Sequence, residues 1–385
     1  MPNILKEQKK VISMATISKR KKTDGRWQAI VDLPPDPQTG KRRRKWLYAD
    51  DRPTVKRMAN QLEEKIASGN YVEPSKLTVE GYLLQWFDDY CSELASTTQE
   101  GYMNYIKGHI IPFLGKKKLQ EIKPVDIQRF YNSEYKKGYS GTTVLQIHRI
   151  LSRAFKEAMI NNLIENNPML KVKAPEKADF EPTVYDEEQF NELLNSVAGT
   201  NDEVPILLAG MLGLRRGEVL GLRWQDIDFD QKTISIVQTV TFANGKIEFG
   251  PPKTKKSRRT IAAPEGLLKV LEKHYVRQAE QRLKTGPKYK NHDLVYCKEN
   301  GEPINPRTFS RYFKDLLKKY NLPHIRFHDL RHFNATMMLK YGIDVKIASE
   351  RLGHSTTDTT QKIYQHVTKD MDLEAAKKLD KIIQK

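Results

Sequence analysis

The spacing of the apolar residues changes along the chain, and these changes limit the folds that it can form. Between residues 27 and 33 apolar and polar side chains alternate, which is the period of a strand with one buried face. From Thr78 to about residue 168 apolar side chains recur every three or four positions, which predicts helices around a common core. Beyond about residue 183 both patterns occur. Because 385 residues also exceed what one core normally organises, we predict a multidomain protein.

A basic module is predicted within residues 1–75, which hold seventeen Lys and Arg residues against nine Asp and Glu. After the strand at 27–33, a turn rich in proline leads to a run of cations and then to a helix at 55–67. We expect a small sheet with a helix behind it, in which the cations hold DNA phosphates; a solvated basic turn is the alternative. The candidate DNA-binding residues are Lys41, Arg42, Arg43, Arg44, Lys45 and Trp46.

Two larger domains are expected to follow, joined by a linker at 171–182 that contains two prolines. The first, at 77–170, should form four helices, whose start signals are Thr78, Ser96 or Thr97, Pro124 and Ser140. The second, at 183–385, should be mainly helical with a small antiparallel sheet and a C-terminal tail helix, and Asp186 should cap its first helix. Its expected strands lie at 233–240 and 259–262, with a hairpin turn at Asn244-Gly245.

Composition narrows the class of function. The net charge of +18 favours a polyanionic partner, with nucleic acid ahead of a membrane surface. No apolar run approaches the roughly 20 residues that span a bilayer, and no signal peptide is indicated. The two cysteines, Cys91 and Cys297, are far apart, so neither a disulfide scaffold nor a zinc finger is expected. We therefore expect a protein of a reducing cytosol.

Four short segments of the last domain carry side chains suited to phosphate chemistry. Arg215 follows Gly213 at a predicted helix boundary. Lys253 lies in a cationic turn at 253–256, which we expect to be the tip of a hairpin and which could bring an ammonium group into a site. His328 and Arg331 are three residues apart and so share one face of a helix. The neighbouring apolar stripe, which should anchor this helix in the core, consists of Leu330, Phe333, Met337 and Tyr341. An imidazole and a guanidinium presented together suit an anion.

The fourth segment begins at Leu352-Gly353, where a helix is expected to end. His354 follows directly, and Tyr364 lies ten residues further on. Taken singly, each of these residues has an ordinary structural explanation. The order of the four segments is what attracts attention.

In this order, the segments resemble the tyrosine recombinase (phage integrase) family. The resemblance implies that Tyr364 is the nucleophile, that Arg215 and Arg331 clamp the phosphate, and that Lys253 is the general acid, although Lys255 and Lys256 are close by. His328 and His354 would complete the site. Glu218 and Asp226 also match family positions, and we interpret both as structural.

The resemblance also implies how the domains act. Residues 1–75 resemble the arm-binding sheet domain of integrases from phages and conjugative transposons, and residues 77–170 resemble the core-binding domain. The expected partners are double-stranded attachment sites, further copies of the chain in a homotetramer, and, in some systems, an excisionase and DNA-bending proteins. The cytoplasm of a bacterial host is the expected location.

Elementary chemistry supports this set of residues. Two guanidiniums on separate elements offer donors that strengthen as charge develops on the phosphate oxygens. Because a phosphotyrosine would store the phosphodiester energy, neither ATP nor another cofactor is expected, and no carboxylate cluster suited to Mg²⁺ is seen. A resolvase of the same family, a type IB topoisomerase and a DNA-binding regulator with a decayed site are the alternatives. Residues 1–75 favour the integrase over the resolvase.

Overall fold

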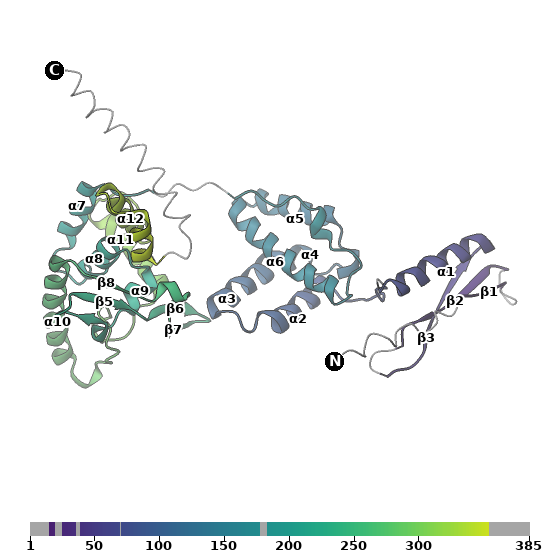
Figure 1. Cartoon of the computed structure of the whole chain (residues 1–385), viewed down its shortest axis with the longest axis horizontal. Helices are drawn as coiled ribbons and strands as arrows, with labels where there is room; N and C mark the ends of the chain where they lie inside the picture. Colours follow the sequence, from purple (N-terminus) through teal and green to yellow (C-terminus); the bar gives the residue numbers. More distant parts are fainter. Residues whose placement is uncertain (1–14, 20–24, 36–38, 70, 178–182, 354–385) are drawn as a thin grey trace, which may run out of the picture. The chain divides into compact units, whose positions relative to one another are not determined.

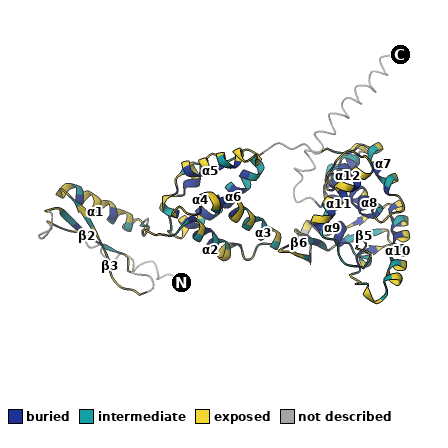
Figure 2. Cartoon of the chain, turned by 180° about the vertical axis from the view of Figure 1, so that it is seen from behind, coloured by how far each residue is buried: buried dark blue, intermediate teal, exposed yellow. Residues whose placement is uncertain are grey.

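The computed structural model describes residues 15–19, 25–35, 39–69, 71–177 and 183–353. The chain divides after Ala178 into two compact units, which are described separately (Figure 1). The first unit contains two hydrophobic cores, and the second contains one large core with a small satellite. Most helices carry buried residues on one side and exposed residues on the other (Figure 2). The expected class, mainly helical with small antiparallel sheets, is confirmed.

The first core of the N-terminal unit lies between a sheet and one helix. The elements are β1 (Thr16–Lys19), β2 (Trp27–Leu33), β3 (Arg43–Ala49) and α1 (Arg52–Ala67). The strands pair antiparallel in the order β1-β2-β3, and Ala29 and Val31 of β2 are buried with Val55 and Ala59 of α1. Sequence analysis missed β1, which is short and carries little apolar patterning.

The second core of this unit is surrounded by helices. Their bounds are α2 (Val79–Cys91), α3 (Ser96–Tyr105), α4 (Ile111–Leu114), α5 (Pro124–Lys136) and α6 (Gly141–Ile160). A π-helical turn at Ile106–Ile110 joins α3 to α4, so these two form one interrupted helix. The capping roles expected of Thr78 and Ser140 are confirmed. The expected cap at Ser96 or Thr97 is wrong, because Ala95 precedes the first helical residue and no side chain caps this helix.

The C-terminal unit is mainly helical. Its helices are α7 (Glu187–Val197), α8 (Glu203–Leu212), α9 (Arg216–Gly221), α10 (Glu265–Thr285), α11 (Pro306–Lys319), α12 (Asp329–Lys340) and α13 (Val345–Leu352). Its strands are β4 (Ile227–Asp228), β5 (Thr233–Ile236), β6 (Thr239–Ala243), β7 (Lys246–Gly250) and β8 (Arg259–Ala262). The large core of this unit contains residues between Tyr185 and Phe333, among them residues of α8, α11 and α12.

The strand expected at 233–240 is two strands that belong to different sheets. β5 pairs with β4 and β8, whereas β6 pairs with β7 in a separate sheet. The chain passes from one sheet to the other at Val237 and Gln238. There the side-chain Nε2 of Gln238 donates to the carbonyl oxygen of Gly221 at 3.1 Å. The hairpin at Asn244-Gly245 is confirmed, and both residues have positive φ, 51° and 75°.

Candidate active site

Arg215 lies where the chain turns from α8 into α9. Gly213 ends α8 with φ 66°, and a Cβ atom there would lie 2.3 Å from the side chain of Leu352, so both the turn and the packing require glycine. The backbone N–H and the Nη1 of Arg215 both donate to Glu218, at 3.0 and 2.8 Å. Its Nη2 donates to the carbonyl oxygen of Gly353 at 2.8 Å. Because about a third of the side chain, 34%, is exposed, the fixed guanidinium can also meet a ligand from solvent.

Glu218 is the buried counter-charge of this site. Its carboxylate also accepts a hydrogen bond from Nη2 of Arg259 at 3.1 Å, so it serves two arginines. Burial raises the pKa of the carboxyl, but the charges and hydrogen bonds of Arg259 and Arg215 outweigh burial and lower the pKa overall. The carboxylate is therefore ionised at neutral pH. Its structural interpretation from the sequence agrees with this geometry, as does that of Asp226, which binds the guanidinium of Arg223.

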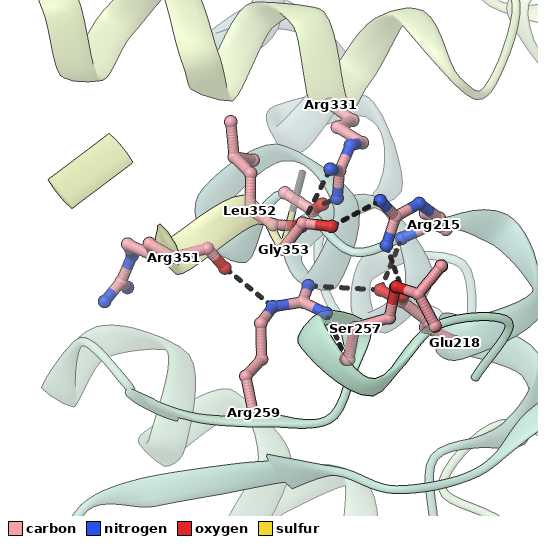
Figure 3. Close-up of polar contacts among 10 residues, drawn as sticks. Arg215, Glu218, Ser257, Arg259, Arg331, Arg351, Leu352 and Gly353 are labelled. Atoms are coloured by element: carbon pink, nitrogen blue, oxygen red, sulfur yellow. Dashed lines mark hydrogen bonds and ion pairs between the residues drawn. The ribbon is translucent and has the colours of Figure 1, made fainter. Parts of the chain in front are cut away.

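Arg331 is fixed on α12 and is buried. Its Nη1 donates to the carbonyl oxygen of Gly213 at 2.5 Å and its Nη2 to that of Leu352 at 2.7 Å. Burial and the neighbouring charge of Arg215 lower its pKa to about 9, which leaves the guanidinium protonated at neutral pH. Arg215 and Arg331 therefore bind adjacent carbonyl oxygens from two different helices (Figure 3).

His328 occupies the position before α12, three residues from Arg331. The residue as a whole is exposed, yet desolvation of the imidazole by the surrounding protein, together with the charges of His332 and Arg331, lowers its pKa to about 4. The ring of His332 lies edge-on to it, with 5.2 Å between ring centroids. His328 is thus neutral at physiological pH, and its ring can both donate and accept a hydrogen bond.

The apolar stripe expected beside these residues is only partly buried. Leu330 and Phe333 lie in the core, and Met337 packs against it. Tyr341 was expected there too, but this is wrong, since 70% of its surface is exposed and its hydroxyl donates to Glu187 at 3.0 Å. The reason is that α12 ends at Lys340, so Tyr341 no longer follows the helical face.

Lys253 lies in the segment 251–258, which joins β7 to β8. The expectation that it sits on a hairpin tip is wrong, because these strands belong to different sheets. The side chain is exposed, and no partner of it is found among the described residues. The segment is closed by a turn in which the backbone N–H of Ser257 donates to the carbonyl of Thr254 at 3.0 Å. Which lysine of this segment acts therefore stays a prediction.

The segment of the sequence that leads to Tyr364 begins at the end of α13. Gly353 ends this helix with φ 67°, as the sequence predicted. His354 follows it directly in the sequence. His354 and Tyr364 both lie outside the described residues, so their predicted roles are carried by the sequence alone.

Sequence reasoning missed Arg259, which is nearly buried in this cluster. Its Nε donates to the carbonyl oxygen of Arg351 at 2.7 Å, its Nη1 to that of Ser257 at 3.0 Å, and its Nη2 to Glu218. One signal was available. Arg259 and Ile261 are two residues apart on a predicted strand and so share one face, and Ile261 faces the core.

The six candidate DNA-binding residues at 41–46 do not form a uniform row. Along β3 the side chains alternate, so Arg44 and Trp46 face away from α1 together with Tyr48. Arg42 and Arg44 both pair with Asp32, at 2.5 and 3.3 Å, and Arg43 pairs with Glu73. Lys45 lies over the ring of Tyr71 at 5.8 Å, and Lys41 is exposed.

Two classes of feature are absent from the described part of the chain. There, no three His, Cys, Asp or Glu side chains are grouped closely enough to hold a metal ion. No helix in those ranges is both long and apolar enough to span a membrane.

Comparison with known proteins places these residues in context. The model described as "Phage integrase family" matches residues 183–371, and that of the "Phage integrase, N-terminal SAM-like domain" matches residues 78–135. A tyrosine recombinase XerC-like protein of Caldanaerobacter subterraneus subsp. tengcongensis is 33% identical over 284 residues, which cover 69% of this chain and 72% of the relative. The ICEBs1 integrase of Bacillus subtilis is 28% identical over 378 residues, covering 95% of this chain and all of the relative (100%).

The fold has solved counterparts. The structure of the Tn1549 transposon integrase in complex with transposon right end DNA matches with a TM-score of 0.66 at 21% identity. The match covers 79% of this chain and 100% of that chain.

Proposed function

The chain belongs to the tyrosine recombinase (phage integrase) family, and we propose that it is the integrase of a mobile element, with the residues of its candidate site in the roles given below. It is a site-specific DNA recombinase. The integrase assignment is supported by the ICEBs1 integrase, because that similarity runs through the N-terminal module as well as the two larger domains. A resolvase remains the second candidate, since the XerC-like relative is the more identical one over the part that it covers.

In the proposed reaction, the phenolic oxygen of Tyr364 attacks the scissile phosphate. The new bond joins phosphorus to the tyrosine oxygen, and the bond from phosphorus to the 5′ oxygen breaks, which leaves a 3′-phosphotyrosine. The phenolic proton passes to the neutral imidazole of His328, and Lys253 supplies a proton to the leaving 5′ oxygen. His354 contributes a further donor to the phosphate. Attack by the free 5′ hydroxyl of the partner strand then reverses these steps and restores Tyr364.

One observation carries this proposal above the others, namely the pair formed by Arg215 and Arg331. Each guanidinium has five N–H donors, and the hydrogen bonds described for each use two nitrogens. The remaining donors are held on two rigid elements and are directed by a buried carboxylate and by backbone carbonyls. Such donors gain strength as charge develops on the non-bridging oxygens and need no rearrangement when it does.

If the chain is the integrase of a mobile element, each of its domains has a separate role. Residues 1–75 bind distal arm sites through the outer face of the β1–β3 sheet, residues 77–170 bind the core site, and residues 183–385 cleave. Affinity for DNA is dominated by phosphate contacts, as the net charge of +18 favours. An excisionase and DNA-bending proteins set the direction of the reaction, in the cytoplasm of a bacterial host.

Assembly into a homotetramer is assigned to the C-terminal unit. A groove of about 690 Å³ lies between α7, α8, α12 and α13, and it is mainly apolar. Met211, Ile343 and Ile347 line it and are partly exposed, at 38%, 39% and 58%. Residues 370–385 lie outside the described chain and place Leu373, Ala376, Leu379 and Ile383 at helical spacing. We assign the groove to this segment of a neighbouring protomer.

The test is recombination in vitro between two plasmid sites taken from the ends of the element that encodes the chain. The protein, with an excisionase and a DNA-bending protein added, should join them in buffer with EDTA and without ATP, and the circular product should be found by sequencing across the junction. Relaxation of supercoiled DNA that lacks these sites, with no junction formed, would instead indicate a topoisomerase. A requirement for paired identical sites from a replicon, with no activity on the element ends, would favour the resolvase.

A further inference from the structure

We propose that Arg259 is a positioning residue for DNA cleavage. It joins the segment that carries Lys253 to the end of α13 and to the pair Arg215 and Arg331, which we call the arginine clamp. This inference rests on the proposed function. Arg259 has no role in the reaction proposed for the other site residues.

The contacts of Arg259 reach three separate parts of the chain. Nε donates to the carbonyl oxygen of Arg351 at 2.7 Å, at the end of α13. Nη1 donates to the carbonyl oxygen of Ser257 at 3.0 Å, in the segment that carries Lys253. Nη2 donates to Glu218 at 3.1 Å, the carboxylate that also holds Arg215. Only a guanidinium has three nitrogens that can serve three acceptors in one plane.

Three arginines thus bind three successive carbonyl oxygens at the end of α13. Arg259 binds that of residue 351, Arg331 that of residue 352 and Arg215 that of residue 353 (Figure 3). The carbonyl end of a helix carries partial negative charge, which favours cations there. The arginine cluster therefore fixes the last carbonyl groups of α13, and His354 follows them directly in the sequence.

Arg259 also limits how the lysine-bearing segment can move. Ser257 is four residues after Lys253, and the turn between them is closed by the Thr254–Ser257 backbone hydrogen bond and by a contact of 2.8 Å between their hydroxyl oxygens. The guanidinium of Arg259 also lies against Gly353, where a Cβ atom would come within 3.2 Å of Nη1. A shift of this turn is therefore opposed by contacts with both Glu218 and the end of α13.

The consequence concerns the leaving group. If Arg259 keeps the turn at residues 254–257 in a fixed position relative to the arginine clamp, loss of Arg259 misplaces Lys253. Protonation of the leaving 5′ oxygen is then slower. A sulfur in that bridging position leaves without a proton. Loss of Arg259 should then slow cleavage of the ordinary phosphodiester much more than cleavage of the 5′-bridging phosphorothiolate. A residue needed only for folding would affect both substrates equally.

The experiment compares single-turnover cleavage rates of nicked suicide duplexes from one end of the element, with bridging oxygen or sulfur at the scissile position. The variants of the full chain are Arg259→Gln and Arg259→Lys, with Lys253→Ala as the reference. Arg259→Lys keeps a positive charge beside Glu218, so it retains the fold if the Gln variant does not. Arg258→Gln is the matched control, because Arg258 is the adjacent, exposed arginine.

Both Arg259 variants should raise the sulfur-to-oxygen rate ratio by about tenfold or more over wild type, in the direction of Lys253→Ala, and Arg258→Gln should leave it unchanged. A folded Arg259→Lys protein with the wild-type ratio, while Lys253→Ala raises it, overturns the positioning role alone. A wild-type protein that attaches to neither substrate contradicts the proposed function instead. The two failures are therefore distinguishable.

Discussion

The carboxylate of Glu218 holds Arg215 at both ends, accepting from its backbone N–H at 3.0 Å and from its guanidinium at 2.8 Å. The first contact caps α9 and the second orients the side chain, so one buried carboxylate fixes both the position and the direction of the Arg215 guanidinium. An acidic residue lies within this cluster of arginines because its carboxylate orients two of them.

Glu218→Gln should weaken both the fold and the reaction. The substitution leaves Arg215 and Arg259 beside a neutral amide, and removing one partner of a buried pair typically costs about 3 kcal/mol of unfolding free energy. Because its pKa is lowered in the folded protein, the carboxyl contributes stability above its ordinary value of 4.5, and this is lost as the pH falls through the folded-state pKa. Denaturant unfolding at several pH values should show the difference from wild type shrinking below about pH 4.5.

The control for this prediction is Glu187→Gln. Glu187 pairs with Lys340 on the surface, where ion pairs contribute little. If Glu218→Gln is no more destabilising than Glu187→Gln, Glu218 does not act as the buried counter-charge described here.

His328 should remain neutral over the whole physiological range. Its pKa is lowered to about 4 by the surrounding protein and by nearby cations, against an ordinary value of 6.5. Selective ¹³C labelling of histidine, with His328→Gln used for assignment, should show no titration of this ring between about pH 8 and about pH 5. A midpoint near 6.5 would mean that the imidazole is solvated in the folded chain, and would remove the reason for assigning it a neutral role.

Closing the apolar groove should prevent assembly without preventing DNA binding. Ile347→Glu places a carboxylate among Met211, Ile343 and other apolar side chains, and truncation after Asp370 removes the segment assigned to the groove. Both changes should preserve binding of one protomer to a half-site but reduce the synaptic complexes seen on native gels. Leu283→Glu, at an exposed position of α10, is the matched control and should assemble normally.

Two other outcomes would correct this assignment. If truncation alone exposes the groove to a hydrophobic dye in the monomer, the segment folds back on its own domain. If neither change alters synapsis, assembly uses another surface.

Individual residues of the N-terminal sheet should contribute differently to the binding of arm DNA, with those on its outer face contributing most. Arg44→Ala should lower the salt dependence of log K by about 0.9, the value of one phosphate contact, whereas Trp46→Ala should lower the affinity and leave the slope unchanged. Arg43 lies on the opposite side of β3 and pairs with Glu73, so Arg43→Ala serves as the control. Deleting residues 1–75 should abolish arm binding and retain core-site cleavage. Equal effects of Arg43→Ala and Arg44→Ala would indicate a diffuse basic turn.

Local signals in the sequence predicted much of the fold. Asp186 caps α7, Pro124 begins α5 and Asn244-Gly245 closes a hairpin, and each of these depends on contacts within a few residues. Pairing between strands is different, because it joins residues far apart. The alternation at 233–240 could not show that β5 and β6 enter different sheets, and the position of Lys253 was misjudged for the same reason.

The candidate site was predicted in its parts but not in its connections. Arg215, His328 and Arg331 were selected from the order of short segments, and the fold brings the two arginines onto neighbouring carbonyls of α13. Arg259 escaped notice because a buried arginine on a strand is recognised by what surrounds it. Its partners Glu218 and Arg351 are 41 and 92 residues away in sequence.

We predict that Tyr364 attacks DNA and forms a covalent bond with it. Wild-type protein on a nicked suicide substrate should give an adduct that resists denaturant, and mass spectrometry of its peptides should locate the nucleotide on Tyr364. Tyr364→Phe should bind the same DNA and form no adduct, while Tyr275→Phe, which removes an exposed hydroxyl on α10, should form it at the wild-type yield. An adduct at normal yield in Tyr364→Phe, or one located on another residue, would contradict the account.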